Sequence, residues 1–338
     1  MGSLAFWQEL STNNPNAAGK CAEAVMNFNL WSHCGNKDDS FLDIGFMLSN
    51  IQSAVKLHLY IPFGENKDVS DLAPIIKESE VISAIFNDNY AVKDLPNPEN
   101  EDYFWPVMKS GENKYTFIIY QWSISGNQAV TLKNDDSGSG IRFSIDSAKL
   151  QEQIRDFGEP YGVKSSDSFY FRFRIPLHIS DSHSSIVRSY RPKNTFLQST
   201  FATTYIVDFR FNDMRSLPSG IRSEISRSIN SFVAVQKLHF FLMTKAHVDV
   251  ETGAKDTSLR ELEHKIWDGY IQKRFETKDI VAYHCAQKNG NITQWEFFAK
   301  LKVNNSTFRV VIEYLVALAI LSIFFNIASA GLCKLLGF

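Results

Sequence analysis

The C-terminal part of the chain contains twenty consecutive residues without a formal charge, from Tyr314 to Cys333. An α-helix of this length crosses the hydrocarbon core of a bilayer, which is about 30 Å thick. A buried core helix is the alternative, but such a helix usually keeps a polar face toward solvent. Glu313 and Lys334 bracket the run. We therefore expect one transmembrane helix within residues 307–338, preceded by a large domain on one side of the membrane.

The charges that flank this run predict the orientation of the helix. Three basic residues precede it and one follows it: Lys300, Lys302 and Arg309, then Lys334. Because basic residues concentrate on the cytoplasmic side of a membrane span, we expect the N-terminal domain in the cytoplasm. The first ten residues, MGSLAFWQEL, lack the basic segment and apolar run of a secretory signal peptide. The chain is thus predicted to be a single-pass, tail-anchored membrane protein.

The cysteines give no sign of a disulfide framework or of a metal centre. The four are Cys21, Cys34, Cys285 and Cys333, and no two of them have CxxC spacing. Thiols of a cytoplasmic domain stay reduced, and structural zinc sites commonly use closely spaced cysteine pairs. We therefore expect neither a disulfide nor a metal site.

One face of the predicted membrane helix collects small and polar residues, and we call this face the seam. Its members are spaced alternately three and four apart: Ala319, Ser322, Asn326, Ser329 and Cys333. That is the heptad spacing of helix–helix interfaces. In lipid, small and hydrogen-bonding side chains mark the packed face of a helix, and an Asn in mid-membrane requires a polar partner or water. We predict a homo-oligomer that associates through the seam and encloses a pore; the alternative is a plain anchor.

Alternation of apolar and polar residues dominates the chain before the span. Residues 55–61 alternate at every step, as a half-buried strand does. Further strands are expected at residues 41–48, 114–125, 167–179, 200–211, 232–243, 280–286 and 293–303, and helices at residues 71–86, 147–156, 220–229 and 258–275. Residues 133–140 consist of turn formers and charges and are expected to form an exposed loop. The mixed order predicts an α+β fold with a mostly antiparallel sheet and flanking helices, followed by one C-terminal transmembrane helix.

Three parts are predicted along the chain. Residues 1–36 are expected to be helical, because apolar residues between Ala24 and Trp31 recur at roughly helical spacing. Residues 37–304 are expected to form an α+β sensor domain, and residues 307–338 the membrane anchor. No internal repeat or low-complexity linker separates these parts.

Charge is segregated along the sequence, although the net charge of the whole chain is only −2. Residues 1–110 contain seven basic and fifteen acidic residues, whereas residues 168–230 contain nine basic and four acidic residues. Arginine predominates in the second segment, and its planar guanidinium suits phosphate oxygens. We take eight of these residues as candidate ligands of an anionic nucleotide or oligonucleotide: Arg172, Arg174, Arg188, Arg191, Lys193, Arg210, Arg215 and Arg222. The alternatives are a solvated surface or pairing with the acidic first third of the chain.

Catalytic motifs are absent from the sequence, including glycine-rich phosphate loops, GxSxG and HExxH. The tripeptide Asp181–His183 matches the first metal-binding element of calcineurin-like phosphoesterases, but the further ligands of such a site are missing. His284 and Cys285 are neighbours that a strand directs to opposite faces, so they cannot pair as base and nucleophile. We expect no enzyme activity, no catalytic residue and no cofactor. Duplex nucleic acid is not expected as a partner either.

The segments Phe41–Phe46 and Leu59–Phe63, together with the terminal span, resemble the membrane effectors of bacterial anti-phage systems. The similarity is to the Hailong-type effector with a calcineurin-associated "CE" domain. In such systems a nucleotidyltransferase makes a nucleotide signal, and the effector compromises the inner membrane. The resemblance implies a bacterial inner-membrane location and a role in antiviral defence, and it transfers no site residue.

These observations favour a ligand-gated, self-associating membrane effector whose cytoplasmic domain binds an anionic nucleotide and controls an oligomeric ion channel. A non-conducting scaffold that holds a partner at the membrane is the first alternative. A membrane-bound phosphoesterase that uses Asp181 and His183 is the second.

Overall fold

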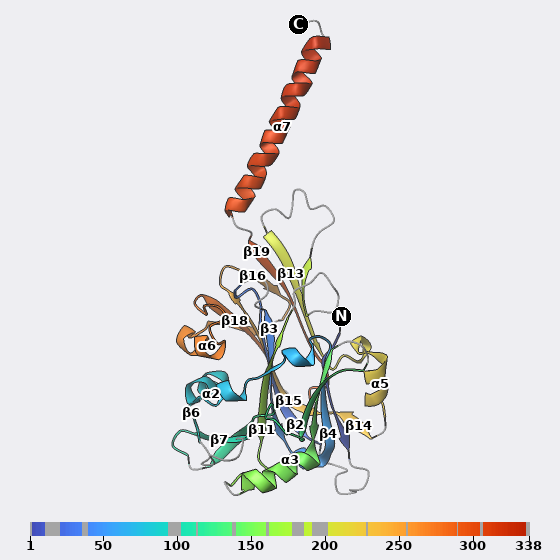
Figure 1. Ribbon diagram of the computed structural model, residues 1–338, viewed down its shortest axis with the longest axis vertical. Coiled ribbons are helices and arrows are strands. Elements are labelled where there is room, and N and C mark those ends of the chain that lie inside the picture. The colour runs from blue at the N-terminus through green and yellow to red at the C-terminus, as the bar shows by residue number, and fades with distance from the viewer. Residues whose placement is uncertain are drawn as a thin grey trace.

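The computed structural model describes residues 2–10, 21–35, 40–93, 103–112, 114–136, 140–159, 162–177, 186–190, 202–227, 229–254, 256–288, 290–304 and 307–335 (Figure 1). The described chain builds three β-sheets with short helices on their outer faces. One long helix, α7 (Thr307–Leu335), extends away from the sheets. The predicted α+β fold with mostly antiparallel sheets and one C-terminal apolar helix is therefore confirmed.

The first sheet has five strands, all paired antiparallel. Its order is β14 (Asn230–Phe232), β1 (Ala5–Leu10), β4 (Ala54–Ile61), β10 (Ile141–Asp146) and β9 (Val130–Asn134). The central strand β4 carries Leu57, Leu59 and Ile61 on its inner face, which is the alternation that the sequence predicts.

The second sheet has ten strands, and both smaller sheets pack on the same face of it. Its order is β17 (Thr257–Glu261), β18 (Ile280–Gln287), β15 (Ala234–Lys245), β2 (Glu23–Trp31), β3 (Phe41–Ser49), β11 (Phe169–Pro176), β8 (Tyr115–Tyr120), β7 (Phe104–Lys109) and β6 (Tyr90–Val92), with β5 (Ser70–Asp71) also paired to β11. Two contacts are parallel, β15 with β2 and β11 with β8, and the other pairs are antiparallel.

The third sheet has four strands in the order β12 (Val187–Tyr190), β13 (Ala202–Phe211), β19 (Trp295–Asn304) and β16 (Asp249–Thr252). All of its pairs are antiparallel. It lies at the end of the molecule from which α7 leaves (Figure 1).

Phenylalanine rings fill the space between the sheets. Phe143 of the five-stranded sheet lies 5.8 Å from Phe46 of the ten-stranded sheet, measured between ring centroids. Phe209 of the four-stranded sheet lies 4.7 Å from Phe28 and 4.8 Å from Phe240. Each such ring pair adds about 0.5–1.5 kcal/mol to the free energy gained by burying its area. The ten-stranded sheet thus shares one continuous core with both smaller sheets.

Helices cover the outer faces of the two larger sheets (Figure 1). On the ten-stranded sheet, α1 (Ala73–Ile76), α2 (Ser79–Phe86) and α6 (His264–Tyr270) enclose a second core around Trp31, Tyr170 and Tyr270. On the five-stranded sheet, α5 (Ser219–Ile225) packs Ile221 and Ile225 against Trp7. Helix α3 (Ser147–Gln153) continues from β10.

The prediction of a helical N-terminal segment is wrong. The described parts of residues 1–36 contain the strands β1 and β2, and β2 pairs with β3 and β15 inside the ten-stranded sheet. The apolar residues of β2 that enter the main core are Ala24, Met26, Phe28 and Leu30, which alternate with period two. Trp31 belongs to the opposite face and its core, so the apparent helical spacing combined residues from two faces. This segment is an integral part of the sheet domain.

Two further local predictions are corrected. The expected helix 258–275 begins as strand β17, and its helical part is limited to α6. The expected exposed loop 133–140 begins with the last two residues of β9 and continues with a buried carboxylate, Asp135. Asp135 is buried because Arg142 of the neighbouring strand β10 binds it at 2.9 Å.

Candidate functional site

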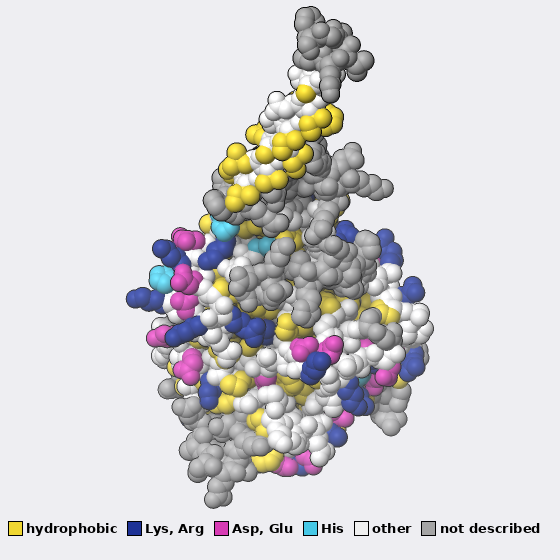
Figure 2. Space-filling model, turned by 45° about the horizontal axis from the view of Figure 1, so that its top comes forward, with side chains coloured by type: hydrophobic (Ala, Val, Ile, Leu, Met, Phe, Trp, Pro, Cys, Tyr) yellow, Lys and Arg dark blue, Asp and Glu magenta, His cyan; other side chains and the backbone are white. Residues whose placement is uncertain are grey.

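Helix α7 contains the predicted membrane span. Residues Tyr314–Leu332 form a 19-residue stretch that is long and apolar enough to cross a membrane, and none of it is buried. Apolar side chains lie along the visible face of this helix (Figure 2). Nineteen helical residues extend about 28 Å, which matches the hydrocarbon thickness of a bilayer. Leaving a large apolar side chain in water costs about 1.5–3 kcal/mol, and a bilayer would remove that cost along this helix.

The seam lies on this helix as the sequence predicts. Ala319, Ser322, Asn326 and Ser329 are all helical and exposed, and Cys333 lies within the same helix. On the surface of a helix, residues three and four apart are neighbours. The four exposed members therefore form one continuous polar and small-residue strip that a second helix can contact.

The junction between domain and helix is short. Strand β19 ends at Asn304 and α7 begins at Thr307, so two residues separate them. β19 is an interior strand that pairs over its whole length with β13, from Trp295 to Asn304, and also with β16. Two residues span at most about 7 Å when extended. The membrane helix is thus tied closely to a strand that is held on both sides.

Arg174 and Asp43 form a buried ion pair in the second core. The Nε and Nη2 atoms of Arg174 donate to the two carboxylate oxygens of Asp43 at 2.7 and 3.0 Å. Asp43 also accepts hydrogen bonds from Trp31 Nε1 at 3.1 Å and from the Tyr270 hydroxyl at 2.7 Å. The guanidinium of Arg174 stacks 4.0 Å above the ring of Phe41. Arg174 therefore holds β11 to β3, and its partner comes from the acidic first third of the chain.

Arg172 lies two residues away on the same face and is fully buried. Its Nε donates to the Tyr270 hydroxyl at 2.6 Å and its Nη1 to the Tyr170 hydroxyl at 2.8 Å. Burial raises the pKa of both tyrosines, so both hydroxyls stay neutral. We call Asp43, Arg172, Arg174, Tyr170 and Tyr270 the Asp43 network. The shared face of the two arginines was predicted correctly, but it points into the protein, so the prediction that they bind an external ligand is corrected.

The other predicted ligand residues are distributed over separate places. Arg210 binds Asp208 at 3.0 Å, and Arg215 lies 3.3 Å from Asp213 with 83% of its side chain exposed. Arg222 is exposed on α5, and Arg188 is half-buried on β12. Arg191 and Lys193 lie outside the described residues, as do Asp181 and His183. The described members therefore do not line one common pocket.

A different set of basic residues does gather on one surface. On the outer face of the ten-stranded sheet, β15, β18 and β17 bring together five residues that we call the basic patch: Lys237, His239, Arg260, His284 and Lys288. His239 Nδ1 lies 3.1 Å from His284 Nε2, and the ring of His284 stacks 4.2 Å from the ring of Phe241. Burial and the neighbouring cations lower the pKa of His239 to about 4 and also lower that of His284. Both imidazoles are thus neutral at pH 7, and they lie beside two lysines and an arginine.

A polar row continues from this patch toward the Asp43 network. The strand register places His239 beside Asn27, Asn27 beside Gly45, and Gly45 beside Arg172. Gly45 is required in this row, because a Cβ there would contact the Tyr170 hydroxyl and Nη1 of Arg172. The basic patch and the buried Arg172 therefore lie at the two ends of one line across the sheet.

Sequence reasoning missed the basic patch because its members are far apart in the chain. Spacing of two within a strand, as in Lys237 and His239, indicates a shared face. It does not reveal which strand lies alongside. The expectation that His284 and Cys285 point to opposite faces is confirmed, since Cys285 belongs to the main core and His284 to the outer face.

No protein-family model matches this sequence, and no curated protein matches it.

Proposed function

We propose that this protein is a single-span, self-associating membrane effector whose cytoplasmic domain binds an anionic, nucleotide-type ligand and controls an oligomeric transmembrane pore. The observation that carries the proposal is the junction of β19 with α7. A domain built only to be anchored tolerates a long linker, whereas control of the membrane helix requires a short one. The proposed setting is the inner membrane of a bacterium, in antiviral defence.

The seam supplies the proposed conducting path. A helix with one polar strip buries that strip most favourably against other copies of itself, because lipid cannot solvate Asn326. In a ring of such helices, Ser322, Asn326 and Ser329 face inward and offer hydroxyl and amide groups to water and ions. The large apolar side chains face the lipid.

The basic patch is the proposed ligand surface. Lys237, Arg260 and Lys288 supply positive charge for phosphate groups, and the two half-buried imidazoles and Phe241 offer ring surface against which a base can stack. A ligand controls the pore only if it binds one assembly state more tightly than the other. The patch belongs to the same sandwich as β19, so ligand binding there can bias the packing of the four-stranded sheet.

Ion flux from liposomes that contain the full-length protein tests the pore. We expect Asn326→Leu to abolish flux, whereas Phe324→Leu, on the opposite side of the helix, preserves it. If both variants conduct like the wild type, the seam does not line a pore.

Two further changes distinguish a domain that controls the membrane helix from a domain that the helix only anchors. Insertion of a six-residue Gly/Ser linker between Asn304 and Thr307 is expected to uncouple flux from a panel of nucleotide signals, whereas the same insertion at exposed Gly253 is not. Replacement of the span by an unrelated Leu-rich helix is expected to abolish function in cells. Retained function after that replacement would establish the scaffold alternative.

Binding of the same nucleotide panel to Lys237→Glu and Lys288→Glu variants tests the ligand surface. We expect each charge reversal to weaken binding at least tenfold and to leave the unfolding temperature unchanged. Unchanged binding in both variants would remove the patch as the ligand surface.

A further inference from the structure

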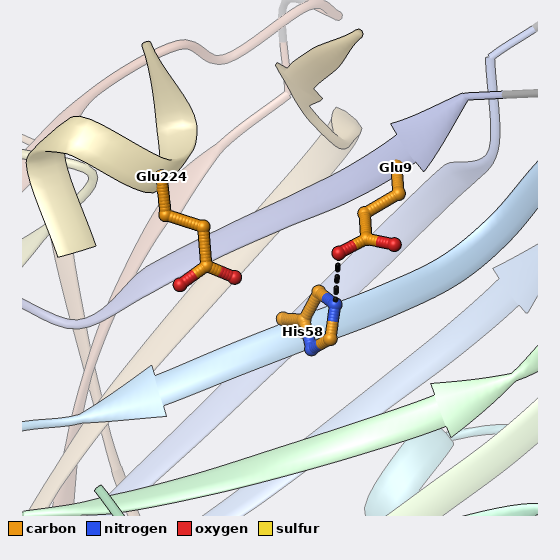
Figure 3. Close-up of side chains that lie close together, drawn as sticks. All are labelled: Glu9, His58 and Glu224. Carbon is orange, nitrogen blue, oxygen red and sulfur yellow. Dashed lines mark hydrogen bonds and ion pairs between the residues drawn. The ribbon is translucent and has the colours of Figure 1, made fainter. Parts of the chain in front are cut away.

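Three potential metal ligands meet on the outer face of the five-stranded sheet. Glu9 comes from β1, His58 from β4 and Glu224 from α5 (Figure 3). One donor atom from each side chain lies within 4.8 Å of the other two. We call these residues the Glu9–His58–Glu224 cluster. Its members are widely separated in sequence, so no spacing motif predicts this cluster.

The imidazole of His58 is held in a fixed position and is only 6% exposed. Its Nδ1 lies 2.8 Å from Ser144 Oγ, and its ring stacks on Trp7 with 5.2 Å between centroids. Without an ion, Nε2 hydrogen-bonds Glu9 Oε1 at 3.2 Å; when the proton lies on Nδ1 and is donated to Ser144, the lone pair of Nε2 faces the carboxylates. Metal-binding histidines are oriented in this way by a partner at the second ring nitrogen.

The spacing of the donor atoms suits a small tetrahedral ion. His58 Nε2 lies 3.2 Å from Glu9 Oε1. In a tetrahedral zinc site with bonds of about 2.0–2.1 Å, neighbouring donor atoms are about 3.3 Å apart. Glu9 and His58 already have this separation, and the carboxylate of Glu224 faces the same space (Figure 3).

Arg142 lies beside the cluster. It binds Glu224 Oε1 through Nη1 at 2.9 Å and Asp135 Oδ2 through Nη2 at 2.9 Å. Among the cluster members themselves, two carboxylates face one imidazole. A divalent cation bound there balances the two carboxylates.

We propose that Glu9, His58 and Glu224 bind a divalent first-row transition metal, with Zn²⁺ the best-suited ion. An imidazole nitrogen with two carboxylate oxygens fits Zn²⁺, whereas Ca²⁺ and Mg²⁺ prefer six or more oxygen donors. The ion joins α5 to strands β1 and β4, next to the apolar contact of Ile221 and Ile225 with Trp7. Its role is to fix this short helix on the sheet, and a fourth coordination position stays open to water.

Calorimetric titration of the metal-free, untagged full-length protein in detergent with Zn²⁺ tests the proposal. A Cys21→Ser background removes the half-buried thiol as a competing ligand. We expect one Zn²⁺ per chain and a rise in the unfolding temperature. Glu9→Gln and Glu224→Gln are expected to weaken binding about 100-fold, and His58→Gln to abolish it. The exposed controls Glu251→Gln and His247→Gln are expected to bind like the parent.

Co²⁺ in place of Zn²⁺ gives a second readout, because its visible spectrum reports four-coordinate geometry. We expect this spectrum in the parent protein and its loss in Glu9→Gln, a half-exposed position where an isosteric amide preserves the fold. Zn²⁺ binding of equal strength in all three cluster variants overturns the proposal, as does the absence of any Zn²⁺ binding by the parent. Equal affinity for Ca²⁺ overturns the assignment to a transition metal.

Discussion

The Asp43 network and the Glu9–His58–Glu224 cluster lie on opposite outer faces of the sandwich. The network contains two arginines and one aspartate, whereas the cluster contains two glutamates and one histidine. In the Asp43 network, Arg174 binds the carboxylate directly, and Arg172 reaches it through the Tyr270 hydroxyl. In the cluster, the carboxylates of Glu9 and Glu224 face His58, and Arg142 binds Glu224. Both places put charge out of full contact with water, which costs several kilocalories per mole for each uncompensated ion.

Access to solvent separates these two places. The side chains of Arg174 and Asp43 are 2% and 0% exposed, whereas those of Glu9 and Arg142 are 29% and 26% exposed. The fully buried Asp43 network is sealed from solutes, whereas the partly exposed cluster is reachable and can bind an ion from solution. Similar side chains therefore serve the fold in one place and offer a binding site in the other.

Asp43→Asn is the change with the largest expected effect. It leaves Arg172 and Arg174 buried without a carboxylate, and breaking a buried ion pair in this way costs about 3–5 kcal/mol. Thermal unfolding of the solubilised protein measures the loss. The matched control is Asp208→Asn, whose partner Arg210 is half-exposed, and a cost of at most about 1 kcal/mol is expected. Equal costs for the two variants contradict the distinction between sealed and reachable groups.

Gly45→Ala tests how tightly the Asp43 network is packed. The added methyl would lie 2.4 Å from the Tyr170 hydroxyl and 2.8 Å from Nη1 of Arg172, so these side chains must move. Overpacking of this kind costs about 1–3 kcal/mol. Gly253→Ala, with nothing within 4 Å of the new Cβ, is expected to be neutral. A neutral result for Gly45→Ala indicates that the network has room to rearrange.

The pH dependence of unfolding tests the basic patch, whose two imidazoles are half-buried. The pKa of His239 is about 4 in the folded protein, against about 6.5 when unfolded. Between these values the unfolded chain binds more protons, so the contribution of His239 to stability is fully present well above pH 6.5 and is lost as the pH drops toward 4. After allowance for partial exposure, the loss is about 1–2 kcal/mol. The lowered pKa values of His58 and His284 add to the loss in the same direction. His239→Gln is expected to flatten this part of the profile, and exposed His247→Gln to leave it unchanged.

Arg215→Ala is expected to have the smallest effect, below about 0.5 kcal/mol in thermal unfolding. Its guanidinium contacts Asp213 at 3.3 Å, but 83% of the side chain is exposed, so water replaces the contact. A loss comparable to that of Asp43→Asn would show that exposure does not decide the strength of these pairs.

Local patterns predicted much of the architecture. The alternation in β4, the apolar run of β11 and the uncharged stretch of α7 each require only neighbouring residues, and all three elements are present. The prediction of a helix in the N-terminal segment is wrong because β2 is covered on both faces. Its apolar residues belong to two cores, and taken together their spacing resembles that of a helix. Fold class thus follows from sequence here, whereas the assignment of a two-sided strand requires its neighbours.

The candidate sites were less predictable than the fold. The arginine-rich segment was visible as composition, but composition does not show that Arg174 meets Asp43 from a distant strand. Neither the basic patch nor the Glu9–His58–Glu224 cluster has a spacing motif, because strand register and the position of α5 assemble them. Charge counts along a chain locate candidates, and only partners and burial decide their roles.

In the proposed effector, the two-residue junction between β19 and α7 would let the domain act on the helix as a lever. A helix about 28 Å long that keeps its angle to the strand moves its far end by about 5 Å when the strand tilts by about 10°. That displacement is close to the rise of one helical turn. A tilt too small to break any sheet hydrogen bond could therefore bring a different set of residues opposite one another in the far leaflet.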